Sequence, residues 1–536
     1  MGRPEPAILA PASGCAPTSG TRAAVSLVQG LSLSSVRRRV PHVAVAAGVL
    51  ALAACMPFGD RASGDPSPHQ VLAVGFENLS DRYIEQVSLD KASLAGLKRL
   101  NAFDPEIGFA RSRGMMRLSL GGSEVAARPE PGPNDALGWA WLAGDMVEAA
   151  RRASPRLARH SIDDLYDAVF AGVFSGLDAY TRYAGPTAAR RSRESREGFG
   201  GIGVTIEIED GETRIAVVHP GTPAANGGVE RDDVITHVDG EPIHGLSQVD
   251  VVTRLRGPVG IPVRITVKRK GRDAPLALRL ERSHVVPPTV IAQREGDVLT
   301  MRLTSFNQRT ALSLDRELRA AIREANGRLA GIVLDLRGNP GGLLDQAIEV
   351  SDLFLGSGRV VTTRGRHPDS NQTFDSGGGE PGEAPPMVVL VNGRSASSAE
   401  IVAAALADRR RAVIVGSTTY GKGTVQTIVR LPNSGEITLT WSRLFGPSGR
   451  TINEAGVAPT ICTAGGNGRS AALIAALRGH RATVALLTQQ PADANGACPR
   501  DTETHTTDTE IARLLLADRQ LYTALVGARR PFVAER

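Results

Sequence analysis

Hydrophobic residues recur every three or four positions through much of the segment from Leu72 to about Leu177, which is the spacing of one face of a helix. The runs Leu94-Leu97-Leu100 and Ile162-Leu165-Val169-Val173 are examples. A polar break with three prolines at 128–134 divides this region, and the charged segment 190–197 is expected to be mobile. The pattern predicts a helical N-terminal region over residues 71–190.

Residues 198–285 show shorter apolar runs separated by turn residues. Strands are expected at 204–206, 213–218, 233–238 and 263–268, and the third of them leads into the turn pair Asp239-Gly240. Helical spacing returns only at 247–256. We therefore expect a separate β-rich domain here.

From residue 286 the pattern changes again, to short and continuously apolar runs that alternate with helical stretches. The apolar runs lie at 332–336, 387–391 and 412–415, and the helical stretches between them at 343–355 and 399–409. Such runs are typical of strands buried on both faces, and the alternation predicts an α/β core with a parallel-rich sheet. The core is assigned to 286–462, with parts of 160–197, and the tail 463–536 is expected to be helical at 471–477 and 511–525.

The first 54 residues have the pattern of an export signal. Arg37, Arg38 and Arg39 precede an apolar run over 43–54, which is too short to span a membrane comfortably. Leu52-Ala53-Ala54-Cys55 resembles a bacterial lipobox, in which the cysteine carries the lipid. Residues 1–35 fit no signal region, so they are either disordered or precede a true start near Val36. We expect an exported, periplasmic protein anchored to a membrane through Cys55 and a tether at 55–70.

Composition and charge narrow the function classes. The chain has 536 residues, 41% hydrophobic and 22% charged, which is enough for several folded domains. The formal net charge of +6 suggests a nucleic-acid partner, but only 4% of residues are aromatic. Removal of residues 1–54 leaves 57 basic against 55 acidic residues, a net charge of +2, so no nucleic-acid partner is expected. Four scattered cysteines are too few for a zinc module, and no metal is expected.

Three expected strand ends carry residues that could do chemistry: 335–342, 392–400 and 416–426. The third fits G-x-x-x-x-G-K, but Gly423 stands where a P-loop needs a Ser or Thr for magnesium, and a β-branched run follows where it needs a helix. An NTPase is therefore excluded. In the core the only histidine, His367, lies in a long polar segment, so a Ser-His-Asp triad is poorly supported. A lysine kept neutral by burial can replace histidine as the base, and Lys422 suits that role.

With these residues the chain resembles the C-terminal processing (tail-specific) peptidases. The matching motifs are 335–342, Ser395-Ala396-Ser397-Ser398-Ala399-Glu400 and Tyr420-Gly421-Lys422-Gly423-Thr424-Val425-Gln426, with Lys422 25 residues after Ser397. The resemblance covers roughly residues 160–462. It implies a Ser/Lys endopeptidase without a cofactor, built on a Clp-protease/crotonase-like α/β core with an inserted PDZ domain at 198–285.

Carried over residue by residue, the resemblance makes Ser397 the nucleophile and Lys422 the general base. Gln426, placed on the same strand face as Lys422, would orient its amine. Backbone N–H groups of Ser398 and of Gly341 and Gly342 would form the oxyanion hole. The family usually reads Ser-Ala-Ser-Ala-Ser-Glu, and the chain departs from it at Ser398-Ala399. That departure bears on a second serine and leaves the nucleophile and base in place.

The PDZ resemblance rests on the glycine cluster, a Pro-Gly-Thr-Pro-Ala-Ala stretch and Asp232-Asp233-Val234-Ile235 before Asp239-Gly240. Successive N–H groups of a glycine-rich loop can hold a peptide carboxylate, and the next strand edge can pair with the peptide main chain. The expected peptide-binding residues are Gly201, Ile202, Gly203, Val204, Val251 and Leu255. The partners implied are polypeptide C-terminal ends, with self-association or a regulatory adaptor left open.

Simpler structural roles for these residues, and other functions for the chain, are also open. Ser397-x-x-Glu400 is also a helix-capping box, and most lysines are solvated. Asp335 and Arg337 are interpreted as a structural ion pair at a strand end. Cys462 and Cys498 either form a disulfide that closes the tail onto the core or remain two free buried thiols. The rival function is a peptide-binding scaffold with a dead peptidase core, and a third is a small-molecule enzyme on a crotonase-like fold.

Overall fold

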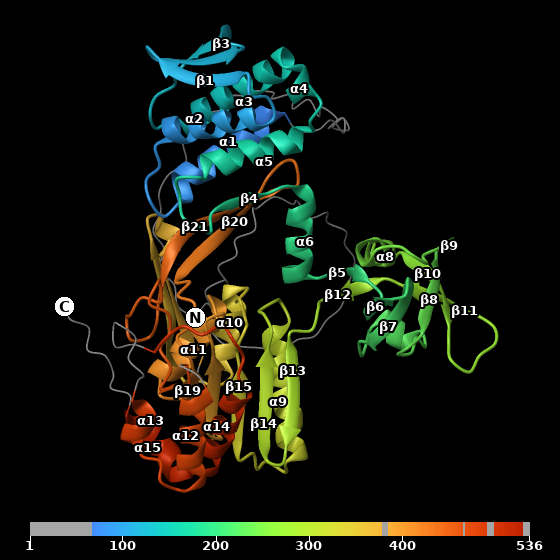
Figure 1. Cartoon of the computed structure of the whole chain (residues 1–536), viewed down its shortest axis with the longest axis vertical. Helices are drawn as coiled ribbons and strands as arrows, with labels where there is room; N and C mark the ends of the chain where they lie inside the picture. The colour runs from blue at the N-terminus through green and yellow to red at the C-terminus, as the bar shows by residue number, and fades with distance from the viewer. Residues whose placement is uncertain (1–66, 378–383, 465–466, 490–497, 529–536) are drawn as a thin grey trace, which may run out of the picture. The chain divides into compact units, whose positions relative to one another are not determined.

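The computed structural model describes residues 67–377, 384–464, 467–489 and 498–528, and its elements are labelled in Figure 1. The expected export signal, Cys55 and most of the expected tether lie outside these ranges. Within them, no helix combines the length and the apolar character needed to cross a bilayer.

The N-terminal region is a helical layer with a small sheet. Helices α1 (Pro68–Arg82), α2 (Leu89–Lys98), α3 (Ala136–Ala153) and α5 (Ile162–Val173) bury one shared core. The short helices η1 (Arg99–Ala102) and α4 (Pro155–Ala158) join them. An antiparallel sheet of β1 (Ile107–Ser112), β2 (Met115–Leu120) and β3 (Ser123–Pro129) corrects the all-helical expectation. Arg113 and Gly114 have φ of +53° and +71°, the double left-handed turn that favours a tight hairpin.

The charged segment expected to be mobile is a helix. It forms α6 (Pro186–Glu197), which follows the short strand β4 (Arg182–Ala184). Arg193 donates to Glu436 Oε1 at 2.8 Å and Arg196 to Glu436 Oε2 at 3.0 Å, and the Glu436 side chain is only 3% exposed. These long-range ion pairs, which local sequence cannot reveal, hold the helix against strand β21 (Glu436–Phe445).

Residues 199–285 form the expected β-rich domain. Its sheet has the order β11-β10-β8-β7-β6, so that β6 is an edge strand. Helix α8 (Gln248–Leu255) covers the hydrophobic core, and α7 (Pro223–Asn226) is a single turn. The strands are β5 (Phe199–Gly201), β6 (Val204–Glu209), β7 (Glu212–Val218), β8 (Val234–Val238), β9 (Glu241–Pro242), β10 (Pro262–Lys268), β11 (Leu276–Glu281) and β12 (Ser283–Val285).

The α/β core is built on a six-stranded sheet of order β13-β14-β15-β18-β19-β22, in which every pair after β13-β14 is parallel. This confirms the parallel-rich expectation. Both faces are buried: Val388 and Leu390 of β18 pack on one side, and Met387 and Val389 on the other. The strands are β13 (Val290–Glu295), β14 (Val298–Leu303), β15 (Gly331–Asp335), β18 (Met387–Val391), β19 (Val413–Gly416) and β22 (Ile461–Cys462).

Helices cover both faces of this sheet. One face buries α9 (Thr310–Glu324), α10 (Leu344–Asp352) and α11 (Ser398–Asp408). The other buries the tail helices α12 (Asn467–Arg478), α13 (Val484–Thr488), α14 (Thr506–Ala517) and α15 (Arg519–Ala528). The single helix expected over 511–525 is thus two helices, which meet at Asp518.

A second sheet, of order β17-β16-β21-β20 with β4 paired to β21, was not predicted. Its members are β16 (Gly358–Gly365), β17 (Gln372–Ser376), β20 (Thr424–Arg430) and β21 (Glu436–Phe445), and η2 (Pro368–Ser370) lies between the first two. The hairpin β20–β21 places Val429, Ile437 and Leu439 in the N-terminal core. The strand that follows Lys422 is therefore packed against residues from the far end of the chain.

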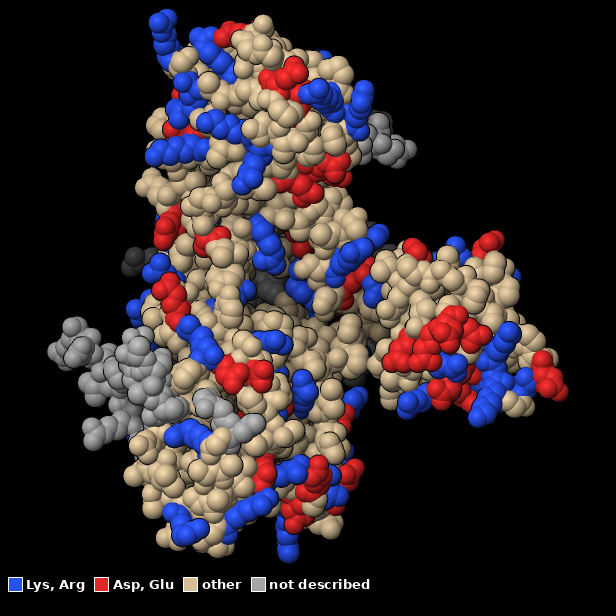
Figure 2. All heavy atoms as spheres, in the orientation of Figure 1, with Lys and Arg blue, Asp and Glu red and all other residues tan. Residues whose placement is uncertain are grey.

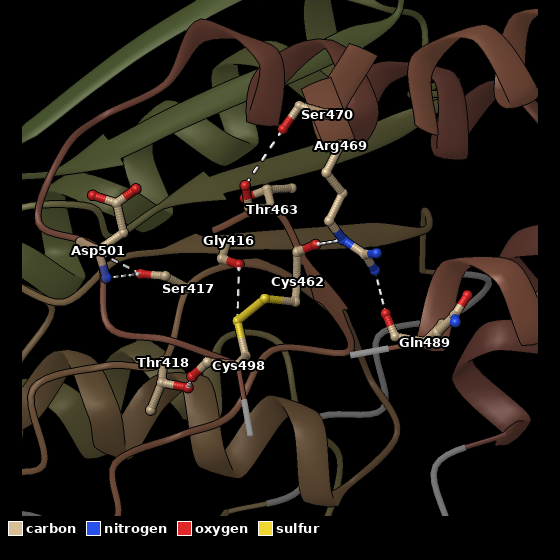
Figure 3. Close-up of a disulfide and its surroundings, with 10 residues drawn as sticks. All are labelled: Gly416, Ser417, Thr418, Cys462, Thr463, Arg469, Ser470, Gln489, Cys498 and Asp501. Carbon is tan, nitrogen blue, oxygen red and sulfur yellow. Dashed lines mark hydrogen bonds between the residues drawn. A yellow bond between two sulfur atoms is a disulfide. The ribbon is translucent and has the colours of Figure 1, made fainter. Parts of the chain in front are cut away.

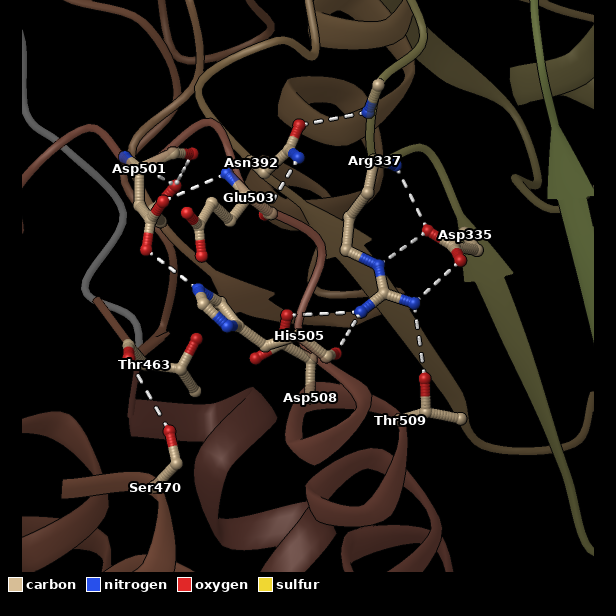
Figure 4. Close-up of polar contacts among 12 residues, drawn as sticks. Asp335, Arg337, Asn392, Thr463, Ser470, Asp501, Glu503, His505, Asp508 and Thr509 are labelled. Atoms are coloured by element: carbon tan, nitrogen blue, oxygen red, sulfur yellow. Dashed lines mark hydrogen bonds and ion pairs between the residues drawn. The ribbon is translucent and has the colours of Figure 1, made fainter. Parts of the chain in front are cut away.

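The tail is bonded to the core through Arg337, as Figure 4 shows. The guanidinium donates to both carboxylate oxygens of Asp335, at 2.9 and 2.8 Å, which confirms the predicted ion pair. It also donates to Asp508 at 3.1 Å and to the His505 carbonyl at 2.5 Å, both near the start of α14. Both carboxylates and the guanidinium are almost fully buried.

Replacing Arg337 by methionine is expected to lower the free energy of unfolding by about 3–5 kcal/mol, because two buried carboxylates lose their counter-ion. The urea midpoint followed by circular dichroism measures this change. Arg319→Met, which removes an exposed pair with Asp315 within one helix, is the matched control and should leave the midpoint unchanged. Equal midpoints for both variants would contradict the prediction.

Candidate active site

Ser397 lies where strand β18 turns into helix α11. Its backbone has φ +54° and ψ −115°, a conformation that costs a non-glycine residue about 1–3 kcal/mol and that concentrates at functional sites. The preceding turn is rigid, because the buried Ser395 hydroxyl accepts from Asn392 N–H at 3.0 Å and donates to the Leu336 carbonyl at 2.8 Å. The structure thus presents a half-buried serine on a strained strand-to-helix turn.

Glu400, in the first turn of α11, connects Ser397 to Lys422. Its Oε2 accepts from Ser397 N–H at 2.8 Å and from Lys422 N–H at 2.9 Å. Its Oε1 accepts from the Thr419 hydroxyl at 2.5 Å and from Gly421 N–H at 2.6 Å. Burial raises the pKa of Glu400, and these four hydrogen bonds to the carboxylate oppose that rise. Because one oxygen bonds both N–H groups, Ser397 and Lys422 are held as close neighbours.

The predicted oxyanion groups gather beside Ser397. A methyl group on Gly341 would come within 2.8 Å of Ser397 Cβ, and the Ser398 hydroxyl donates to the Gly342 carbonyl at 3.0 Å. Gly341 N–H is already bonded to Asn339 Oδ1 at 2.8 Å. In the described part of the chain, the N–H groups of Gly342 and Ser398 have no acceptor. The N–H groups of Gly342 and Ser398, rather than that of Gly341, are therefore open to a further acceptor.

Lys422 lies in the loop between β19 and β20 and is partly buried. Burial lowers the pKa of its amine below the usual lysine value, and the nearby Arg182 lowers it further, while Glu400 and Asp178 oppose this. Its Nζ is 4.8 Å from the centre of the Tyr180 ring. The lysines Lys91, Lys98, Lys268 and Lys270 are all exposed. Lys422 is thus placed in the environment that favours a neutral amine.

Asp178 and Tyr180 are site residues that the sequence did not indicate. The Asp178 carboxylate accepts from Tyr180 N–H at 2.7 Å and from the hydroxyls of Thr181 and Thr440 at 2.6 and 2.9 Å. We call these hydrogen bonds of Asp178 with Tyr180, Thr181 and Thr440 the clasp. The clasp fixes the Tyr180 ring over Lys422 and attaches the end of the N-terminal region to strand β21. No local pattern signals such a role, because the partners are about 260 residues apart along the chain.

Gln426 lies in strand β20 and Lys422 precedes that strand, so strand alternation alone does not place the two side chains on one face. The register shift beside Gln426 adds a residue, Trp441, to the partner strand β21 and leaves β20 without an extra residue. Gln426 Nε2 donates to the hydroxyls of Thr424 and Thr440, at 2.9 and 3.3 Å. Through Thr440 it joins the Asp178 clasp, so its connection to Lys422 runs through that network.

The β-rich domain carries a groove of about 200 Å³ between β6 and α8. Gly201, Ile202, Gly203, Val204 and Leu255 line it, as predicted. Val251 does not, because it is fully buried in the domain core. Val252, one residue on, faces the groove together with Gln248, and the positions 248, 252 and 255 lie on one helix face.

Basic and acidic side chains are interspersed over the face seen in Figure 2 rather than gathered in one basic patch. Within the described ranges, no group of three or more His, Cys, Asp or Glu side chains is placed to hold a metal ion.

The site combines a serine on a strained turn, a desolvated lysine beside it and two N–H groups that have no acceptor in the described part of the chain. Together these features define a serine hydrolase site. The same chain also carries a domain of a peptide-binding type. Comparison with known families agrees. The model of peptidase family S41 matches residues 297–463, and that of the PDZ domain matches 214–269. The chain belongs to the carboxy-terminal processing proteases, which are S41 serine peptidases.

Two curated relatives support this membership. The carboxy-terminal-processing protease of Bartonella bacilliformis is 39% identical over 326 residues, which cover 59% of this chain and 73% of that protein. The carboxy-terminal processing protease CtpA of Bacillus subtilis is 33% identical over 303 residues, covering 56% of this chain and 64% of the relative. Among solved structures, the photosystem II D1 C-terminal processing protease is 24% identical with a TM-score of 0.37, covering 74% of this chain and 92% of that one.

The pH dependence of activity should report the pKa of Lys422. With the neutral Lys422 amine as the expected base, kcat/KM should rise with pH through this pKa, which lies below that of ordinary lysine. Arg182→Gln removes a positive charge that disfavours the ammonium, so the pKa rises and the acid limb moves to higher pH. Arg430→Gln, an exposed arginine on strand β20, is the control and should leave the limb in place. An unmoved limb in Arg182→Gln would refute the assignment.

Proposed function

We propose that this protease cleaves exported polypeptides that its PDZ domain selects by their C-terminal ends, using Ser397 as nucleophile and Lys422 as general base. The main support for this Ser397/Lys422 dyad is one observation. A single carboxylate oxygen of Glu400 accepts hydrogen bonds from the N–H groups of both residues. The strained turn at Ser397 and the lowered pKa of Lys422 support the same roles.

In the proposed reaction the neutral Lys422 amine takes the proton of the Ser397 hydroxyl as Oγ attacks the scissile carbonyl carbon. The N–H groups of Gly342 and Ser398 stabilise the oxyanion. The Lys422 ammonium then protonates the leaving amine, and an acyl-enzyme ester remains on Ser397. Lys422 next takes a proton from a water molecule as its oxygen attacks the ester carbonyl carbon, and the ammonium returns that proton to Ser397 Oγ when the ester bond breaks. Gln426 and Asp178 position this site through Thr440.

The groove of the PDZ domain suits a peptide end. Edge strand β6 can pair with an added strand, and the loop 201–203 can receive a terminal carboxylate. Val252 and Leu255 make the adjoining surface apolar, so the proposed preference is for apolar C-terminal residues. Gln248 Nε2 donates to the Ile206 carbonyl at 3.0 Å, a bond that an added strand would displace.

The location proposed for the protein is the bacterial periplasm, with a lipid anchor on Cys55. The basic cluster, apolar run and lipobox-like Leu52-Ala53-Ala54-Cys55 support export. The Cys462–Cys498 disulfide fits an oxidising compartment.

Two forms of one unfolded substrate, with a free or an amidated apolar C-terminus, test this function. The free end should be cleaved faster, because only it offers the carboxylate. Val252→Glu should raise KM for the free-ended form by about 10-fold or more while kcat is retained, since it places a charge in the groove. Val249→Glu, on the same helix but 58% exposed and outside the groove, is the matched control. Equal rates for the two substrate forms would contradict selection by the C-terminus.

A further inference from the structure

A short segment of the tail, Cys498–Asp501, runs along the loop that carries Lys422. We call it the strap. The Thr418 hydroxyl donates to the Cys498 carbonyl at 2.5 Å, and Thr418 N–H donates to the Pro499 carbonyl at 3.3 Å. Ser417 Oγ donates to the Asp501 carbonyl at 2.9 Å and accepts from Asp501 N–H at 3.1 Å. Figure 3 shows this pairing, in which residues of the loop bond to the strap one after another.

The Arg500 side chain extends the contacts of the strap from Thr418 to Thr419, which is one residue nearer to Lys422. Its Nε donates to the Thr419 carbonyl at 3.0 Å, and its guanidinium also contacts the Glu454 carbonyl. Thr419 is fully buried, and its hydroxyl donates to Glu400 Oε1. Glu400 in turn holds the N–H groups of Gly421, Lys422 and Ser397. A continuous set of hydrogen bonds therefore joins the strap to both members of the dyad.

Both ends of the strap are held. At one end Cys498 forms a disulfide with Cys462 at the end of β22, with Cα atoms 5.8 Å apart. Of the two alternatives predicted for these cysteines, the structure therefore has the disulfide and not the free thiols. At the other end the Asp501 carbonyl accepts from Gly393 N–H at 2.6 Å, and Asp501 bonds His505 Nε2 at 2.8 Å. Only the cysteine end depends on a covalent bond that a cell can make or break.

We propose that the strap positions the Lys422 loop and that the Cys462–Cys498 disulfide locks it, so that the peptidase reaches full activity only in the oxidised protein. The inference rests on the proposed Ser397/Lys422 dyad. Activity would then follow export into an oxidising compartment, and the same chain with reduced cysteines would be a slow enzyme. Arg500 is a positioning residue in this scheme, since it acts on the dyad through Thr419 and Glu400.

The redox step is an ordinary thiol–disulfide exchange. A dithiol reductant attacks one sulfur of the pair, passes through a mixed disulfide and leaves as a cyclic disulfide, and both Cys462 and Cys498 become thiols. Two electrons and two protons pass from the reductant to the protein. The reverse step needs a disulfide oxidant, such as an oxidised thiol oxidoreductase. The remaining cysteines, Cys15 and Cys55, belong to the expected leader and anchor.

Loosening the strap should change how Lys422 titrates as well as how fast the enzyme works. The groups that face its amine are Glu400 of α11, Asp178 and Tyr180 of the clasp, and Arg182 of β4. These are not bonded to the strap except through Glu400. A looser loop admits water to the amine, which favours its charged form and moves the acid limb of kcat/KM to higher pH.

The experiment compares the oxidised protein, the same protein treated with a dithiol, Cys462→Ala/Cys498→Ala and Arg500→Gln. We expect kcat to fall on the order of 10- to 100-fold in the last three, with KM for the free-ended substrate unchanged, because misplacement of a catalytic group by about 1 Å has effects of that size. The acid limb should move to higher pH, and Arg500→Lys should restore part of the rate. Arg469→Gln is the matched control, because Arg469 donates to the Cys462 carbonyl at 2.9 Å but not to the loop.

The outcomes separate the two proposals. If the oxidised wild type does not cleave, or cleaves as well after Ser397→Ala, the proposed function fails and the strap is not at issue. If the oxidised wild type is active and the reduced protein, the cysteine variant and Arg500→Gln keep its kcat and acid limb, the locking role is wrong. The locking role would also be overturned if kcat fell while the acid limb of kcat/KM stayed in place and Arg469→Gln lost as much kcat. That result indicates general destabilisation.

Discussion

Substituting Ser397 by alanine is expected to abolish cleavage of an unfolded protein, with kcat/KM reduced by about 10⁴-fold or more. The change removes the only atom that can form the acyl-enzyme and leaves the N–H groups of Gly342 and Ser398 in place. Peptide binding by the PDZ groove should persist, because Val252 and Leu255 belong to a domain with its own core. Gel-resolved digestion and binding of a labelled peptide together measure the two effects.

A control for Ser397→Ala comes from the same turn. Arg394 is exposed, and its side chain takes no part in the bonds that shape the turn, so Arg394→Ala should keep activity to within about twofold. If Ser397→Ala and Arg394→Ala cleave alike, Ser397 is not the nucleophile. Loss of peptide binding in Ser397→Ala would instead show that the variant is misfolded, which thermal unfolding would reveal.

Substituting Lys422 by arginine is expected to reduce kcat by about 10²–10⁴-fold, although the positive charge is retained. A guanidinium stays protonated at all accessible pH values and so cannot accept the Ser397 proton. The loss should persist up to high pH, whereas activity of the wild type rises there. This difference in pH profile distinguishes a missing base from a disturbed fold.

Lys98→Arg is the matched control for Lys422→Arg, because Lys98 is exposed at the end of α2, remote from the site in sequence. It should behave as wild type. If Lys422→Arg retains activity at neutral pH, another group is the base and the dyad must be abandoned. Lys422→Ala would then show whether the side chain is needed at all.

The sequence predicted Ser397 and Lys422 as a catalytic pair because each belongs to a motif with a specific spacing. It did not predict Glu400 as the group that joins them, since a capping box accounts equally well for a glutamate three residues after a serine. Asp178 and Tyr180 carry no local signal, because their roles depend on contacts with Thr440 and Lys422 across most of the chain.

One prediction that rested on periodicity alone was wrong by one residue. Val251 and Val252 are both apolar and both fit a helical repeat, so only packing shows that the first lies in the core and the second in the groove.

By itself the sequence determined the order of the parts from residue 71 onward: a helical region, a PDZ domain, an α/β peptidase core and a helical tail. Local periodicity and turn residues encode each of these over short distances, and so they can be predicted from the sequence. Only the tertiary structure decided which distant groups meet: Glu400 with both Ser397 and Lys422, Asp178 with Thr440, and the disulfide-bonded strap with the lysine loop. Such contacts arise from long-range packing, and no short stretch of sequence records them.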